Sequence, residues 1–163
     1  MRGGFFELNV TYSLSGGGGF TPTESSKAPG GTFTVAATPS RDGYNFTGWS
    51  DGIAIYLPGS IYTVGSSNVT LTALWTAINY TITYSLGGAS GTTPTESSKT
   101  IGQKFNLAST PSRTGYNFTG WSDGTNTYAA GAEYTVGSAN VTLTAQWSPK
   151  IVTFSYNLNG GSW

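Results

Sequence analysis

The chain has 163 residues, only 9% of them charged, with equal numbers of acidic and basic side chains, no histidine and no cysteine. A formal net charge of zero leaves no basic excess to displace counterions from phosphates, so we expect no nucleic-acid partner. The missing histidines and cysteines remove the commonest general base, the commonest transition-metal ligands and any disulfide. The sequence has no run of about 18 apolar residues, so we expect no membrane insertion.

A repeat with constant spacing dominates the sequence. The stretch GYNFTGWSDG stands at 43–52 and again at 115–124, and the hexapeptide PTESSK also occurs twice. Trp49 and Trp121 show the spacing (121 − 49 = 72), and no gap is needed to align the copies. Such a period predicts a tandem array of small modules.

The repeat predicts five parts. In chain order they are an N-terminal extension (1–7), a first module (8–76), a linker (77–79), a second module (80–148) and the truncated start of a third repeat (149–163). Within the last part, residues 152–158 align with the opening strand of the second module. We therefore expect them to form the first strand of a third copy.

We predict each module to be mainly β, with little helix. The opening strand of the second module alternates Tyr80, Ile82, Tyr84 and Leu86 with Thr and Ser, and the closing strand at 141–147 alternates in the same way. A period of two with Thr on the outer face is typical of a half-buried strand.

The middle of each module adds a turn, a strand and a hairpin. In the first copy a Pro-Ser-Arg-x-Gly turn at 39–43 leads into a strand at 44–50, and Asp51-Gly52 marks a hairpin. Phe46 and Trp49 are three residues apart, so in a regular strand their side chains would point to opposite faces. Either a bulge near Gly48 restores the phase, or the tryptophan covers the opposite face.

The repeated tryptophans have two interpretations. A module of about 70 residues is marginally stable, and one buried indole contributes about 4–6 kcal/mol before entropy is subtracted, so a core anchor is the first interpretation. The second is a ligand platform, in which Trp49 or Tyr56 stacks on a sugar face. Trp121 or Tyr128 would do so in the second module.

The charged residues predict no catalytic, metal or cofactor site. The seven acids are spread through predicted turns, and Asp51 precedes a glycine where Asp is favoured for backbone reasons. Glu24 with Lys27 is interpreted as a solvated loop pair, as is the equivalent pair in the second module. Arg41 and Arg113 either hold a partner carboxylate or pack over a neighbouring aromatic ring.

These residues also resemble a known family. The order Pro-x-Arg-x-Gly-Tyr-x-Phe-x-Gly-Trp at 39–49 and 111–121, followed by Val-Thr-Leu-Thr-Ala-x-Trp, resembles the Listeria–Bacteroides repeat, also called the internalin B-repeat. The resemblance implies small β-grasp-like (ubiquitin-like) modules in tandem, which serve as stalk or adhesion modules of large bacterial surface proteins and carry no catalytic residues. The glycine run at 16–19 departs from the family pattern.

The leading functional hypothesis is a non-enzymatic repeat of a bacterial cell-surface protein, acting as a stalk or spacer with adhesive contacts. The alternatives are a carbohydrate-binding module and a filament subunit that assembles by strand addition through 152–158. The expected partners are a host or neighbouring-cell surface protein or glycan, or a second copy. The expected location is extracellular or at the cell surface, directed by an export signal outside this chain.

Overall fold

The computed structural model describes residues 6–157 and 159–160, and the chain forms two compact units, residues 1–79 and 80–163. We refer to these units as the first and the second module. All regular elements in the described part are strands, which confirms the prediction of a mainly β fold with little helix.

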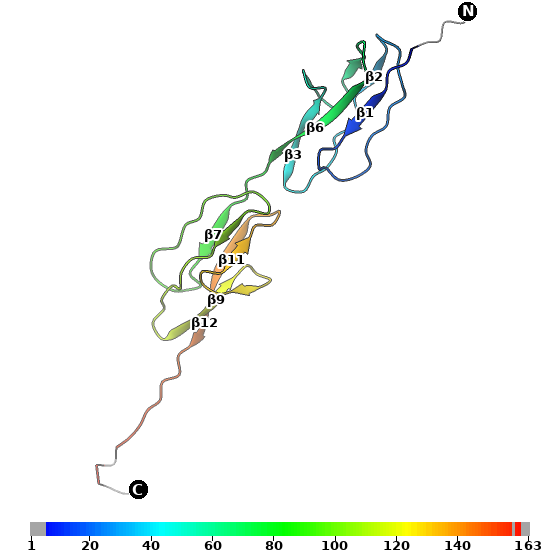
Figure 1. Cartoon of the computed structure of the whole chain (residues 1–163). Helices are drawn as coiled ribbons and strands as arrows, with labels where there is room; N and C mark the ends of the chain where they lie inside the picture. The colour runs from blue at the N-terminus through cyan, green and yellow to red at the C-terminus, as the bar shows by residue number, and fades with distance from the viewer. Residues whose placement is uncertain (1–5, 158, 161–163) are drawn as a thin grey trace, which may run out of the picture. The chain divides into compact units, whose positions relative to one another are not determined.

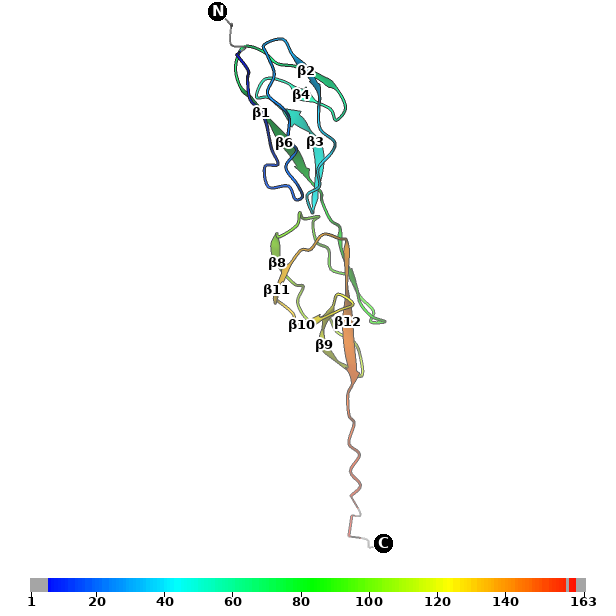
Figure 2. The same ribbon diagram turned by 90° about the vertical axis from the view of Figure 1, so that its right-hand side faces the viewer.

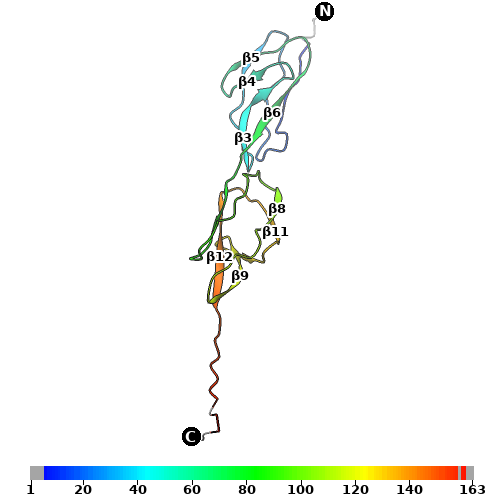
Figure 3. The ribbon, with the colours of Figure 1, turned by 90° about the vertical axis from the view of Figure 1, so that its left-hand side faces the viewer.

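The first module contains a mixed four-stranded sheet with strand order β1-β6-β3-β4. Figure 1 shows β6 between β1 and β3; β1 runs parallel to β6, whereas β3 runs antiparallel to it. A two-stranded ladder of β2 and β5 accompanies the sheet, and Figure 3 labels β5 together with β4, β3 and β6. The strands are β1 (Val10–Ser13), β2 (Thr32–Thr34), β3 (Tyr44–Ser50), β4 (Ile55–Tyr56), β5 (Ile61–Thr63) and β6 (Val69–Ala77).

The second module repeats this topology strand for strand. Its sheet has the order β10-β9-β12-β7, with β12 next to β9 (Figure 2), and β8 pairs with β11 in the small ladder. The strands are β7 (Ile82–Ser85), β8 (Lys104–Asn106), β9 (Tyr116–Ser122), β10 (Thr127–Tyr128), β11 (Glu133–Thr135) and β12 (Val141–Pro149).

The alternation of the opening strand decides which face is buried. In β1, Val10 and Tyr12 are buried, while Thr11 is exposed and its hydroxyl lies 2.8 Å from that of Thr70 on β6. The predicted inward set of the second copy behaves in the same way, with Tyr80, Ile82 and Tyr84 at 9%, 4% and 8% exposure. Hydrophobic burial on one face and a threonine ladder on the other therefore fix the register of these strands.

Of the two alternatives at Gly48, the bulge is the one present. Phe46 pairs with Trp75 but Gly48 pairs with Leu74, so Thr47 is an extra residue in β3. The bulge lets both Phe46 and Trp49 reach the core, where their rings lie 5.4 Å apart. Gly48 is required there because a Cβ at this position would lie 2.4 Å from the Cγ2 of Ile55.

Strand pairing continues past the predicted module ends. β6 reaches Ala77, and the next backbone N–H, that of Ile78, donates to the carbonyl of Gly43 at 2.8 Å. In the second module Lys150 donates to Gly115 over the same distance. The first residues of each predicted connection are thus hydrogen-bonded to the module that precedes them.

The predicted first strand of a third repeat has no strand pairing over 152–157, and Leu158 lies outside the described residues. Val152, Phe154 and Tyr156 are 69%, 81% and 86% exposed. A strand forms only against a neighbour that accepts its backbone hydrogen bonds, and no strand of the described residues pairs with this segment.

Candidate functional site

Trp49 and Trp121 are core residues. Both side chains are 0% exposed, and their indole N–H groups donate to the carbonyls of Ala36 and Ala108 at 3.0 and 2.9 Å. Tyr12 meets the Trp49 ring edge-on at 4.8 Å. Neither tryptophan offers a ring face to a ligand, so the first interpretation, a core anchor, holds for both rings, and the alternative that they stack on sugars is wrong.

Tyr56 belongs to a hydrogen-bonded cluster at the β3–β4 hairpin. Asp51 Oδ1 accepts the backbone N–H groups of Ile53 and Ala54 at 2.9 and 2.8 Å, which closes the predicted Asp-Gly turn. Asp51 Oδ2 accepts the hydroxyls of Tyr56 and Tyr62 at 3.1 and 3.2 Å. The carboxylate thus serves the fold, as its position before a turn glycine indicated.

The second module contains the same cluster. Asp123 accepts backbone N–H groups from Thr125 and Asn126 and the hydroxyls of Tyr128 and Tyr134. Tyr128, a predicted ligand contact, therefore has its hydroxyl committed to this carboxylate. Its ring meets that of Tyr134 edge-on at 5.2 Å.

The hydrogen bonds and burial in the two clusters change the pKa values of their carboxyl and tyrosine groups. The Ala54 N–H, the Ile53 N–H and the two tyrosine hydroxyls hold the pKa of Asp51 below its usual value, although partial burial opposes them. Burial, and then the hydrogen bond to Asp51, raises the pKa of Tyr62 to about 12. Burial, and then the charge of Asp123, raises the pKa of Tyr134 to about 12.

Arg41 and Arg113 pack over aromatic rings. Each guanidinium carbon lies 3.9 Å from the centroid of a tyrosine ring, Tyr44 in the first module and Tyr116 in the second. One nitrogen of Arg41 also donates to the carbonyl of Ser15 at 3.1 Å, and Arg113 donates to that of Gly87 at 3.2 Å. The interpretation of these arginines as packing over a neighbouring aromatic ring is confirmed.

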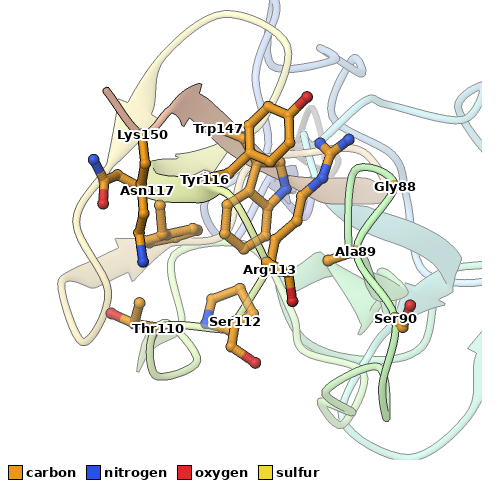
Figure 4. A pocket seen from close by; sticks show the side chains of 13 residues that line it. Gly88, Ala89, Ser90, Thr110, Ser112, Arg113, Tyr116, Asn117, Trp147 and Lys150 are labelled. Carbon is orange, nitrogen blue, oxygen red and sulfur yellow. The ribbon is translucent and has the colours of Figure 1, made fainter. Parts of the chain in front are cut away.

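Arg113 also lines a pocket of about 830 Å³ in the second module. Figure 4 shows the rings of Tyr116 and Trp147 at its centre, with Lys150 on one side of them and the Arg113 guanidinium on the other. Both rings are partly exposed. Hydroxyl and amide groups also line the pocket, supplied by Ser90, Thr110, Ser112, Thr114 and Asn117.

The pocket has a positive lining. Its two charged residues are Arg113 and Lys150, and no Asp or Glu lies among the residues that form it. The corresponding hollow of the first module measures about 350 Å³ and includes both Arg41 and Asp42. Among the sites that the structure describes, this pocket combines exposed aromatic surface with convergent polar groups, which is the usual composition of a ligand site.

The predicted loop ion pairs are present. Lys27 Nζ lies 2.7 Å from a carboxylate oxygen of Glu24, and the equivalent atoms of Lys99 and Glu96 are 2.9 Å apart. These side chains are about one-fifth exposed, so the pairs are less solvated than the sequence suggested. The hydrogen bond from Lys27 lowers the pKa of Glu24, and that from Lys99 lowers the pKa of Glu96.

Sequence reasoning missed three residues of the pocket: Tyr116, Trp147 and Lys150. A signal was nevertheless present, because two positions near the shared turn differ in charge between copies that are otherwise similar. Lys150 stands where the first module has Ile78, and Thr114 stands where it has Asp42. Both changes make the second copy more positive.

The topology, the repeat spacing and the buried tryptophans define a protein of tandem β repeats. Residues 8–79 match the family described as the divergent InlB B-repeat domain, and residues 80–146 match the Listeria–Bacteroides repeat domain. The two modules belong to this repeat family, as the aromatic and glycine spacing indicated.

Two relatives from Evansella cellulosilytica bear the names "Putative Gly-rich membrane protein" and "Putative membrane protein". The first is 34% identical over 75% of this chain, and the second is 31% identical over 88% of it. The chain spans only 14% and 22% of their lengths. The match to this chain therefore covers only part of two much longer relatives.

Among solved structures, the chain is similar to streptococcal high identity repeats in tandem (SHIRT) domains 3–4 from a cell surface protein. The identity is 14% and the TM-score 0.32, with 89% of this chain and 99% of that chain covered. Within the described residues, no helix has the length and apolar character needed to cross a bilayer.

Proposed function

We propose that the chain is a pair of non-enzymatic spacer modules in a bacterial cell-surface protein. One observation carries this proposal: the first and last strands of each module are parallel neighbours, β1 beside β6 and β7 beside β12. Because parallel strands run in the same direction, the chain enters a module at one end of the sheet and leaves at the other. Each added module therefore lengthens the protein.

The length gained per module follows from the closing strand. β6 and β12 each contain nine residues, which at about 3.3 Å per residue extend about 30 Å. Pairing to Gly43 and Gly115 continues one residue beyond these strands, so the exit of the chain is anchored. An exit held in this way suits a stalk better than a loosely tethered domain does.

We infer further that the module is a variant of the β-grasp. A mixed sheet in which the first and last strands are adjacent and parallel, with the next strand antiparallel to the last, supports this assignment. Residues 14–31 of the first module follow β1 without forming a helix. In this proposal the irregular segment takes the place of the usual helical crossover.

A length measurement tests the spacer. Insertion of a second copy of residues 80–151 directly after residue 151 should increase the maximum dimension by about 30 Å in small-angle X-ray scattering. The matched control is an insertion of equal length that is rich in Gly and Ser, which should broaden the distribution of distances instead. An added copy that leaves the maximum dimension unchanged would contradict the spacer.

The second candidate function is carbohydrate binding, and the pocket of the second module favours it. Partly exposed aromatic rings surrounded by hydroxyl and amide groups suit a sugar. The residues proposed are Trp147, Tyr116 and Arg113, since Trp49 and Trp121 are buried. A glycan array probed with the whole chain tests this function, with the Trp147→Ala variant as the negative control.

The third candidate is self-association through 152–157, favoured by the exposed Val152, Phe154 and Tyr156. A second copy could pair with this segment along its backbone. Sedimentation velocity over a hundredfold range of concentration tests it, with Phe154→Ser and Tyr156→Ser as the variant. A chain that stays monomeric at the highest concentration would eliminate this candidate.

We place the protein at the cell surface. The relatives are membrane proteins by name, and spacer modules act where a binding part must be held away from an anchor. Protease shaving of intact cells tests this location, because a surface module is removed while a cytosolic marker is retained.

A further inference from the structure

The pocket of the second module has an electrostatic property that the first module lacks. Arg113 and Lys150 carry two positive charges, and no acid contributes to the lining. Within residues 6–157 and 159–160, the salt bridges involve other pairs, so neither cation is neutralised there. An anionic group in the pocket would gain from both charges without displacing an existing partner.

The Arg113 guanidinium is held in place before any ligand arrives. Its central carbon lies over the Tyr116 ring, 3.9 Å from the ring centroid, and one nitrogen donates to the Gly87 carbonyl at 3.2 Å. Gly88 lies on its other side, where an added Cβ would lie 3.6 Å from the nearest guanidinium nitrogen. A guanidinium has five N–H donors, so several remain to bind a carboxylate with little further loss of side-chain entropy.

The aromatic part of the pocket is equally fixed. The indole N–H of Trp147 donates to the carbonyl of Leu86 at 2.9 Å, and its ring meets that of Phe118 edge-on at 5.6 Å. These contacts orient the ring without covering it, since Trp147 remains partly exposed. The site therefore presents a rigid aromatic surface between two cations, with a rim of hydroxyl groups (Figure 4).

Comparison of the two copies shows that the positive charge is specific to the second module. The first copy has Ile78 in place of Lys150 and Asp42 in place of Thr114, while the arginine, the tyrosine and the tryptophan are the same. These two positions and the arginine therefore have a net charge of zero in the first copy, against two positive charges in the second. The tyrosine ring and the guanidinium pack together in both modules, so their contact belongs to the shared fold. Lys150 has no charged counterpart in the first module, so its charge is not part of that fold.

From these observations we propose that the second module binds an acidic saccharide, with a sugar against Trp147 and Tyr116 and separate carboxylates of the saccharide at Arg113 and at Lys150. This inference rests on the second candidate function, carbohydrate binding, and adds the ligand class and the residues that select it. The first module, with its neutral counterpart of the pocket, would not bind this ligand.

A matched pair of ligands tests the proposal on the whole chain. Trigalacturonate and its fully methyl-esterified form share one sugar skeleton and differ in charge. Isothermal titration calorimetry at low salt should give at least tenfold tighter binding of the acid than of the ester. In ¹H–¹⁵N spectra the acid should shift the Trp147 indole N–H signal and leave that of Trp75 in place.

Two substitutions convert the pocket to the chemistry of the first module. Lys150→Ile and Thr114→Asp should each weaken binding of trigalacturonate about threefold, and the double variant about tenfold. Lys104→Ile is the control, because it removes one positive charge from an exposed position on β8 that does not line the pocket. Thermal unfolding of each variant verifies that the module remains folded.

The results of these experiments distinguish carbohydrate binding from selectivity for a carboxylate. Equal affinity for acid and ester would retain a carbohydrate site and overturn its proposed selectivity for a carboxylate. The selectivity would also be overturned if Lys104→Ile weakened binding of trigalacturonate as much as Lys150→Ile does. Binding of neither ligand at tens of millimolar would overturn both ideas. Tighter binding of a triglutamate peptide than of trigalacturonate would assign the pocket to an acidic peptide and overturn the saccharide.

Discussion

Tyr12 and Trp49 hold the same residue from two sides. The Tyr12 hydroxyl accepts the backbone N–H of Ala36 at 3.0 Å, and the Trp49 indole N–H donates to the carbonyl of Ala36 at 3.0 Å. The two rings also meet edge-on at 4.8 Å. The opening strand, the bulged strand and the irregular segment after β2 are thereby joined at one point of the core.

Replacing Trp49 should therefore unfold much of the first module. We expect Trp49→Ala to lower the free energy of unfolding by about 3–5 kcal/mol, because it removes a fully buried ring and leaves a cavity. Tyr12→Phe should cost about 1 kcal/mol, since it keeps the ring and removes one hydrogen bond. Urea titration followed by circular dichroism measures both. Phe20→Ala, at a fully exposed position, should stay within about 0.5 kcal/mol of wild type.

The bulge glycines should tolerate no side chain. A Cβ at Gly120 would lie 2.4 Å from the Cγ2 of Thr127 and 2.8 Å from the carbonyl oxygen of Tyr128. A backbone atom cannot move away as a side chain does, so we expect Gly120→Ala to destabilise the second module by about 1–3 kcal/mol. The Tm measured by calorimetry should fall accordingly.

Gly137→Ala is the matched control for this prediction, since nothing lies within 4 Å of a Cβ built there. Its effect on the Tm should be small. Equal losses for the two glycine variants would show that the close approach at Gly120 does not determine stability.

The strands could be predicted because they depend on local patterns. Alternation places Tyr80, Ile82 and Tyr84 on one face wherever the strand pairs. The parity of Trp49 left two alternatives, a bulge near Gly48 or a tryptophan on the opposite face, and the bulge is the one observed. The order of the strands could not be read in this way. Val10 pairs with Val69, and no local pattern specifies a parallel partner so distant in the sequence.

The candidate site was harder to predict for the same reason. Packing of Arg41 and Arg113 over a neighbouring aromatic ring was one of two alternatives, and the rings prove to be tyrosines three positions further along the same turn. The pocket instead needs Trp147 and Lys150 from the closing strand and its continuation to lie beside that turn, which the β9–β12 pairing determines. The sequence also left open whether Trp49 and Trp121 are core anchors or sugar platforms, because it does not show which of the two tryptophans in a module is covered.

Alkaline pH should destabilise the first module through Tyr62. Its pKa is raised to about 12 by burial and by the hydrogen bond to Asp51, against about 10 in an unfolded chain. The folded state therefore binds this proton more tightly, and the stabilisation is complete below pH 10 and is lost as the pH rises to 12. Tyr62→Phe should reduce the fall in Tm between pH 9 and pH 11.5. Tyr156→Phe, at an exposed position, should leave that fall unchanged.

Acid should weaken the same cluster through Asp51, with the opposite sign. Hydrogen bonds from Ala54, Ile53 and the two tyrosines depress the pKa of this carboxyl in the folded state, so the ionised form is favoured there. Its contribution to stability is present above the unfolded value of about 3.9 and is lost as the pH falls through the folded pKa. Asp51→Asn should therefore lower the urea midpoint at pH 7 and have a smaller effect at pH 2.5.

Asp42→Asn is the control, because it changes an exposed acid in the turn that precedes β3. This variant should leave the midpoints at both pH values close to those of the wild type. A loss for Asp51→Asn that is as large at pH 2.5 as at pH 7 would mean that the charge of Asp51 does not stabilise the hairpin.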